Sequence, residues 1–231
     1  MTSFRLVKYN EYSLLVTFPG LSLQHANIQV VLLEEFCSRY CQQWLFNQVP
    51  AYESLLLICN SPENVNQVIG EIKQFFQKET PLLSKFEVEE IIVPVCYDLS
   101  LGNDLEQMAA FHQIKIEKLI TCHYQVVYHI YMLGFLPGFA YMGEVDKQIA
   151  TPRKLFPVAT RAGAVGIAGR QTGIYPVDSP GGWNIVGYTP LKMFDLSKPS
   201  PTLLKPGNAV RFIPIDLETY NAFIGNENGS N

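Results

Sequence analysis

The chain has 231 residues, of which 48% are hydrophobic, with a formal net charge of −4 and a pI near 5.6. This length and apolar content are sufficient for a sizeable core in one large or two small domains. The acidic balance offers no electrostatic footprint for nucleic acid or for an anionic membrane surface, so neither is expected as a partner.

The N-terminal sequence MTSFRLVKYNEYSLL lacks a basic region followed by a long apolar run, and no later run approaches the roughly 18 apolar residues of a membrane span. We therefore expect a cytoplasmic protein. The cysteines include no CxxC pair, which argues against a disulfide framework or a zinc knuckle. Cys37 and Cys41 lie one helical turn apart and are expected to be buried thiols.

The first 88 residues alternate strand and helix signals. Ser13–Phe18 and Ser54–Cys59 are predicted strands, and Leu23–Tyr40 is a predicted helix. In a second helix, Ser61 is the expected cap and Pro62 the first helical residue. The predicted apolar stripes are Ile28, Val31, Leu32 and Phe36 on the first helix, and Val65, Val68, Ile69, Ile72, Phe75 and Phe76 on the second. This alternation predicts a small α+β domain with helices on one face of a sheet.

The middle of the chain predicts a strand over Phe86–Val95, a helical pair over Asp104–His123 and a strand over Tyr124–Met132. The helical pair superficially resembles a helix-turn-helix. It has no glycine at the turn and no basic recognition helix, so a plain helical hairpin is favoured. The final NENGSN is expected to be frayed.

Glycine and proline mark a second domain. Eleven of the 16 glycines lie between Gly134 and Gly207, and 10 of the 15 prolines lie between Pro137 and Pro214. Short apolar runs such as Ala164–Ala168 and Trp183–Val186, separated by these residues, predict short strands and tight turns in a closed sheet or barrel. We expect a domain boundary near residue 88, with residues 1–88 as the α+β domain and residues 89–231 as the barrel domain.

The glycines at positions 163, 166, 169 and 173 allow two interpretations. Neither GxxxxGK[ST] nor GxGxxG is present, so close packing in a barrel is favoured over a phosphate loop, and a ligand near Gly169–Gly173 remains the alternative. Polar groups cluster around this segment and could line one groove, or could be satisfied surface residues: Arg153, Arg161, Arg170, Gln171, Thr172, Tyr175, Asp178, Ser179, Trp183 and Asn184. No GxSxG, HExxH or paired-carboxylate signature establishes an enzyme.

Four segments carry a family resemblance: YMLGFLPGFAYMG (131–143), ATPRK (150–154), GIAGRQTGIYPVDSPGGWNIVGYTPLKMFD (166–195) and PTLLKPGNAVRFIPI (201–215). They closely resemble the bacterial family that contains the B subunit of 5-oxoprolinase and the sporulation-kinase inhibitor KipI, long labelled allophanate hydrolase subunit 1. Related fused domains form the carboxyltransferase part of urea carboxylase. With weaker similarity elsewhere, the resemblance covers nearly the whole chain.

The resemblance implies an α+β N-terminal domain followed by a mainly-β, cyclophilin-like barrel domain. It also implies that the chain is one component of an ATP-dependent 5-oxoprolinase and is inactive alone. The implied partners are a companion similar to the C subunit of that enzyme and a protein similar to its A subunit. ATP is then a cosubstrate, with magnesium accompanying it. The alternatives are a KipI-like inhibitor of a sensor histidine kinase and, by fold analogy alone, a prolyl isomerase.

The resemblance also suggests roles for individual residues. The expected catalytic residues are Gln171, Thr172 and His123; the substrate- or nucleotide-binding residues are Arg153, Tyr175, Gly169, Gly173, Phe135 and Tyr141; the interface residues are Phe139 and Trp183. The loop GFLPGFAYMG is expected to expose an apolar patch that packs on the companion or mediates self-association. The segment FPVATRAGAVGIAG departs from the family pattern, with Arg161 in place of proline and Ala164 in place of serine. Arg161 is then the alternative source of positive charge.

Overall fold

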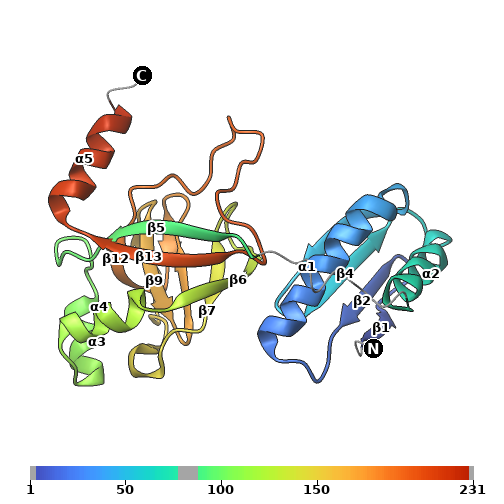
Figure 1. The fold of residues 1–231 in the computed structure, drawn as a ribbon, viewed down its shortest axis with the longest axis horizontal. Coiled ribbons are helices and arrows are strands. Elements are labelled where there is room, and N and C mark those ends of the chain that lie inside the picture. The colour runs from blue at the N-terminus through green and yellow to red at the C-terminus, as the bar shows by residue number, and fades with distance from the viewer. Residues whose placement is uncertain (1–3, 78–87, 229–231) are drawn as a thin grey trace. The chain divides into compact units, whose positions relative to one another are not determined.

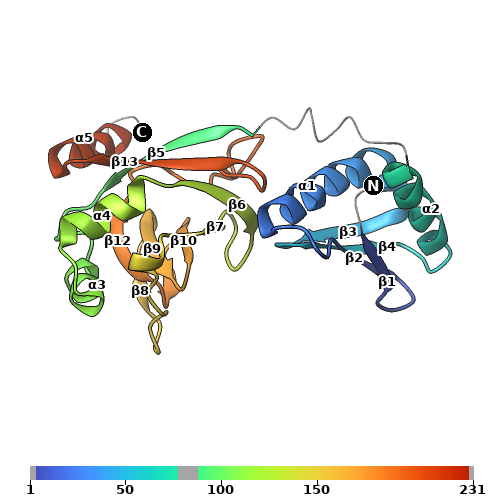
Figure 2. The same cartoon turned by 60° about the horizontal axis from the view of Figure 1, so that its bottom comes forward.

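The structure, a computed structural model, describes residues 4–77 and 88–228. The chain divides into two compact units, Met1–Val88 and Glu89–Asn231. Figures 1 and 2 show a sheet with two helices in the first unit, and a barrel with a helical pair and a C-terminal helix in the second.

The first unit is a four-stranded antiparallel sheet in the order β1-β2-β4-β3, with α1 and α2 packed on it. Alternate residues of the central strands, such as Leu14 and Val16 in β2 and Leu55 and Leu57 in β4, are fully buried beneath the helices. The elements are β1 (Arg5–Lys8), β2 (Ser13–Thr17), α1 (Leu23–Tyr40), η1 (Gln42–Trp44), β3 (Leu45–Pro50), β4 (Ser54–Cys59) and α2 (Asn64–Gln77).

The predicted bounds of α1 and β4 are confirmed, as are the strand at β2 and the burial of Cys37 and Cys41. The predicted start of α2 is wrong by two residues. Asn64 N donates a hydrogen bond to Ser61 O at 3.2 Å, so Ser61 and Pro62 form a turn before the helix.

The predicted apolar stripe of α1 is correct only in part, because Ile28 and Phe36 pack against the core but stay partly exposed. The buried face carries Ala26, Val30, Leu33 and Cys37, and of the four predicted residues only Leu32 is buried. The helix is apolar over most of its middle, so spacing alone does not distinguish the two possible stripes.

The second unit is built around a closed barrel in the order β10-β7-β6-β13-β5-β12-β9. β13 pairs with β5 in parallel and with β6 antiparallel, which joins the end of the chain to the start of this unit. The elements are β5 (Glu90–Cys96), α3 (Leu105–His112), α4 (Ile116–Tyr124), β6 (Val127–Leu133), β7 (Ala140–Gly143), η3 (Lys147–Ile149), β8 (Val158–Thr160), β9 (Ala164–Ala168), β10 (Gln171–Ile174), β11 (Ser179–Gly181), β12 (Asn184–Tyr188), β13 (Ala209–Ile215) and α5 (Leu217–Asn228).

The predictions of a closed barrel and of a helical hairpin are confirmed. β9 has its predicted bounds, and Gly169 turns the chain into β10 with a φ of 60°, a left-handed conformation that suits glycine. Gly166 and Gly173 are cross-strand partners whose missing side chains leave room for Trp183, which supports the packing interpretation at these two positions.

Several elements were not predicted. α5 was missed: it includes the first three residues of the NENGSN end, and the last three lie outside the described residues. β1 and β3 were also missed, and β6 begins at Val127 because α4 continues to Tyr124. β5 begins at Glu90, and the first two residues of the predicted Phe86–Val95 strand are not described. Of the helices within the described residues, none combines the length and apolar character that crossing a membrane requires.

Candidate functional site

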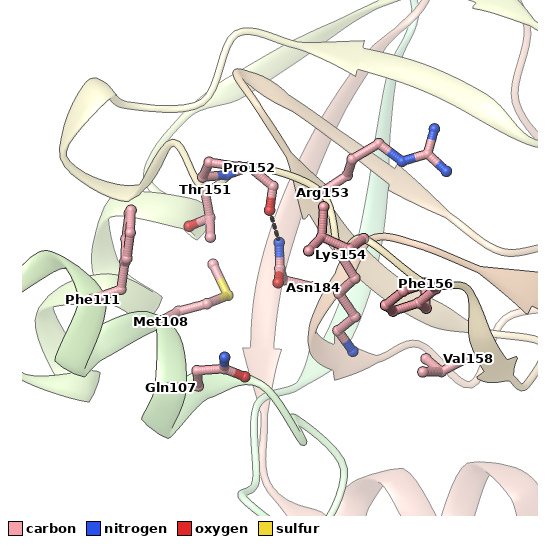
Figure 3. A pocket seen from close by; sticks show the side chains of 11 residues that line it. Gln107, Met108, Phe111, Thr151, Pro152, Arg153, Lys154, Phe156, Val158 and Asn184 are labelled. Atoms are coloured by element: carbon pink, nitrogen blue, oxygen red, sulfur yellow. Dashed lines mark hydrogen bonds between the residues drawn. The ribbon is translucent and has the colours of Figure 1, made fainter.

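Two adjoining pockets of the second unit lie on either side of the segment Thr151–Val158, and Arg153 lines both. The first has a volume of about 550 Å³ and is lined by α3, this segment and the start of β12. The second, of about 440 Å³, lies between the same segment, the loop before β7 and the β11–β12 connection. Figure 3 shows the side chains of the first pocket.

Backbone hydrogen bonds hold the first half of the Thr151–Val158 segment at two points. Gly169 N donates to Thr151 O at 2.7 Å, which joins the segment to the β9–β10 turn. Lys154 N donates to Gly182 O at 2.7 Å, which joins it to the β11–β12 connection. Arg153 and Lys154 therefore extend from a backbone that the barrel fixes on two sides.

The first pocket combines an amide, an ion pair and apolar side chains. Lys154 Nζ lies 2.7 Å from Asp104 Oδ2, and the same carboxylate oxygen accepts a hydrogen bond of 2.6 Å from Ile185 N. Asn184 Nδ2 donates to Pro152 O and to Ile167 O. Met108 and Phe111 of α3 supply apolar surface, so the pocket suits a small molecule that carries both apolar and hydrogen-bonding edges.

The second pocket is mostly aromatic. Tyr141, Tyr175 and Trp183 line it, and burial raises the pKa of both tyrosines while the nearby charge of Arg153 opposes that shift. Arg153 is exposed and has no carboxylate partner within residues 4–77 and 88–228. Ser179 Oγ is buried and lacks a hydrogen-bond partner within the same ranges. These groups could receive a planar or anionic ligand.

A chain of hydrogen bonds crosses the barrel interior from Tyr97 through His123 and Thr172 to Gly166. Thr172 Oγ1 donates to Gly166 O at 3.0 Å, so it accepts from His123 Nε2 at 2.9 Å. The other ring nitrogen, Nδ1, then accepts from the hydroxyl of Tyr97 at 2.8 Å. His123 and Thr172 have no solvent exposure, and burial lowers the pKa of His123 to about 3, so the ring is neutral.

The structure brings the predicted site residues together in two groups. His123 and Thr172 meet in the barrel interior, and Gly173 lies in the strand beside them. Five others meet at the second pocket: Arg153, Tyr175, Phe135, Tyr141 and Trp183. Gln171 and Gly169 line neither pocket and lie where β9 turns into β10.

The predicted exposure of Phe139 and Met142 is wrong. Phe139 is 1% exposed and Met142 is fully buried, whereas Phe135 is 62% exposed. The ring of Phe139 has four aromatic neighbours, with ring centroids 4.9–5.7 Å away: Phe135, Tyr141, Tyr175 and Trp183. A side chain at position 173 would approach Phe139 Cζ to 3.0 Å, so Gly173 leaves space for this cluster. Phe139 is therefore a core residue that packs against the aromatic side chains of the second pocket without lining it.

Sequence reasoning did not identify Asp104 or Lys154 as site residues. Asp104 stands directly before α3, where a carboxylate is expected to cap the helix, yet its side chain makes no cap hydrogen bond. Lys154 belongs to the ATPRK segment, which was the available signal for it. Arg161, the expected source of charge, instead lies over the ring of Tyr188 at 5.1 Å.

Comparisons with known proteins identify relatives of the chain. Residues 4–204 match the family described as carboxyltransferase domain, subdomain C and D. The chain is 38% identical over 186 residues to the B subunit of 5-oxoprolinase from Bacillus subtilis (strain 168), covering 76% of this chain and 78% of the relative. It is 44% identical over 137 residues to the corresponding B subunit from Haemophilus influenzae, covering 59% of this chain and 64% of the relative.

Among solved structures, that of TTHA0988 matches with a TM-score of 0.75 and 32% sequence identity. The match covers 89% of this chain and 40% of that one, so this chain spans about two fifths of the length of TTHA0988.

Proposed function

The chain belongs to the family described as carboxyltransferase domain, subdomain C and D. On that premise we propose that it is one component of an ATP-dependent 5-oxoprolinase complex. The proposal is carried by the 38% and 44% identity to B subunits of 5-oxoprolinase. The family match over residues 4–204 includes every residue that lines the two pockets. The substrate is then 5-oxoproline, and the product is glutamate.

The chemistry explains why ATP is needed. The lactam C–N bond is stabilised by amide resonance, so the ring carbon is a poor electrophile. Transfer of the γ-phosphoryl group of ATP to the lactam oxygen activates that carbon, water adds to it, and the C–N bond breaks as the nitrogen takes a proton. A second water hydrolyses the resulting acyl phosphate to glutamate and phosphate. Magnesium would accompany the ATP.

In this scheme the chain binds and orients its ligands. The exposed guanidinium of Arg153 can pair with the substrate carboxylate or with a transferred phosphoryl group. Lys154 Nζ, held by Asp104, places a second positive charge in the first pocket. Charges fixed in this way stabilise a developing negative charge without reorganisation during the reaction.

A companion protein is proposed to complete the groove. Apolar side chains with high exposure lie beside the pockets: Phe111 at 62%, Phe135 at 62%, Leu155 at 93% and Phe156 at 80%. Exposed apolar groups around a ligand pocket are typical of a surface that another protein covers. We assign this role to a protein similar to the C subunit of 5-oxoprolinase, with a protein similar to its A subunit as the third component.

Reconstitution tests the proposal. The chain is co-purified with the two companion proteins, and 5-oxoproline-dependent release of ADP is measured with each protein omitted in turn. We expect activity only from the complete set. The proposal would be contradicted if no combination of the proteins released ADP in a way that depends on 5-oxoproline. Full activity of the chain alone would also contradict it.

A substitution at the first pocket refines this test. Lys154→Met should lower turnover by about a hundredfold or more, because it removes a charge aimed at the reacting groups. Lys192→Met is the matched control, since Lys192 forms an ion pair with Asp195 but lines neither pocket. Equal turnover in the two variants would remove Lys154 from the site.

A further inference from the structure

The side-chain amide of Asn184 has a fixed orientation in the first pocket. Its Nδ2 group donates both hydrogens to backbone carbonyls, to Pro152 O at 2.9 Å and to Ile167 O at 3.1 Å. The reverse orientation would set Oδ1 against two carbonyl oxygens, with no hydrogen between them. The nitrogen therefore faces the backbone, and Oδ1 points away from it, as Figure 3 shows.

The Asn184 Oδ1 atom is an acceptor without a donor. The residue is only 7% exposed, and within residues 4–77 and 88–228 no group donates a hydrogen bond to this oxygen. Asn184 nevertheless lines the first pocket. The oxygen is not among the fully buried, unpartnered side-chain atoms of the described residues, so it is open to the pocket, where a ligand N–H would satisfy it.

The ammonium group of Lys154 is a cationic donor that Asp104 holds next to the backbone of Ile185. Asp104 Oδ2 accepts from Ile185 N at 2.6 Å and lies 2.7 Å from Lys154 Nζ. One carboxylate oxygen thus links the Lys154 ammonium group to the residue that follows Asn184. An ammonium group has three N–H donors, and the ion pair with Asp104 occupies one of them, which leaves donors for a ligand in the same pocket.

We propose that the first pocket recognises a cis amide, with Asn184 Oδ1 accepting the amide N–H and Lys154 Nζ donating to the amide C=O. In a linear secondary amide the N–H and C=O groups point in opposite directions, because the trans form is favoured. In a five-membered lactam the ring enforces the cis form, so both groups lie on one edge. The selection of a lactam as the ligand rests on the proposed function, whereas the amide recognition rests on these contacts.

Ligand analogues test this inference on the unmodified complex. Dissociation constants are measured by calorimetry for 5-oxoproline, for its N-methyl derivative and for the γ-lactone in which oxygen replaces the N–H group. We expect about 5- to 150-fold weaker binding of both analogues, since each would cover the Asn184 oxygen in the filled pocket without donating a hydrogen bond to it. Equal dissociation constants for the three ligands would overturn the inference.

Two variants separate ligand recognition from a structural role. Asn184→Ala should abolish the preference for 5-oxoproline over the lactone, and Val158→Ala, which removes only apolar surface from the same pocket, should retain it. A merely structural residue would weaken binding of both ligands in proportion and leave their ratio unchanged. Should Asn184→Ala fail to fold, the analogue series on the unmodified complex still decides the question.

The outcomes also distinguish this inference from the proposed function. If ADP release depends on 5-oxoproline but all three ligands bind with equal affinity, the proposed function is retained and the proposed role of Asn184 is overturned. The opposite result is also possible. If no complex releases ADP, but the chain alone binds 2-pyrrolidinone more tightly than N-methyl-2-pyrrolidinone, the amide site is supported and the proposed function is overturned.

Discussion

The interior of the barrel and the groove beside it use polar side chains in opposite ways. Inside, Tyr97, His123 and Thr172 donate and accept in one continuous chain that ends on a backbone carbonyl. At the groove, Asn184 keeps an acceptor oxygen without a donor, and Arg153 keeps a guanidinium group without a carboxylate within the described part of the chain. A satisfied network stabilises a fold, whereas leftover hydrogen-bonding capacity at a pocket is available to a ligand.

The second pocket, which is mostly aromatic, is intermediate in character between these two regions. On its inner side, Tyr175 of the lining and Phe139, which packs against it, are each 1% exposed, whereas Phe135 of the lining is 62% exposed. The comparison therefore predicts that substitutions will affect the free energy of unfolding at the inner residues and ligand binding at the outer ones.

The largest expected effect on folding is at Phe139. Phe139→Ala should lower the free energy of unfolding by about 3–5 kcal/mol, because it empties the centre of an aromatic cluster. Urea denaturation of the full chain, followed by the fluorescence of Trp183 in a Trp44→Phe background, reports on the second unit. Phe135→Ala is the control and should change stability by no more than about 0.5 kcal/mol. Similar losses in the two variants would remove the distinction between the inner and outer sides of the second pocket.

The neutral state of His123 makes the stability of the barrel depend on pH. Burial lowers the pKa of His123 to about 3 in the folded protein, against about 6.5 in the unfolded chain. The unfolded chain therefore binds more protons between these values, so stability is present above pH 6.5 and is lost as pH falls toward 3. The loss should be about 1.4 kcal/mol per pH unit for this one group.

Comparison with His123→Gln measures that contribution. The variant should show a shallower fall in the free energy of unfolding between pH 6.5 and 4. Part of the slope should persist, because burial also lowers the pKa of His129, to about 4. Identical slopes in the two proteins would mean that His123 is already protonated in the folded state.

The sequence predicted best what is encoded locally. The bounds of α1 follow from apolar residues at helical spacing, those of β4 from a continuous apolar run, and the barrel from glycines and prolines that interrupt short apolar runs. The contact between Asp104 and Lys154 could not be predicted, because the two residues lie in different elements and neither has a local pattern that refers to the other. Position 104 instead resembles a helix cap.

The error at Phe139 has a similar physical origin. A loop with several aromatics and glycines does not reveal which ring points inward, since that depends on the space left by a residue elsewhere in the chain. Here Gly173 leaves that space, and Trp183 fills its other side. Burial of one ring among several equivalent ones is a property of tertiary packing, so composition alone predicts an exposed patch where the structure has part of the core.

The smallest expected effect on folding, and a large one on binding, is at Arg153. The side chain is exposed and has no carboxylate partner within the described residues, so Arg153→Gln should change the free energy of unfolding by no more than about 0.5 kcal/mol. If its guanidinium group pairs with the carboxylate of 5-oxoproline, loss of that charged hydrogen bond should raise the dissociation constant by about 10- to 100-fold in the assembled complex. Calorimetry with 5-oxoproline measures the change.

Arg170→Gln is the matched control. Arg170 is exposed, as Arg153 is, but it forms an ion pair with Glu144 and lines neither pocket. A lower melting temperature with unchanged affinity would place Arg153 with the structural residues of the barrel, and the difference between interior and groove would no longer predict where ligands bind.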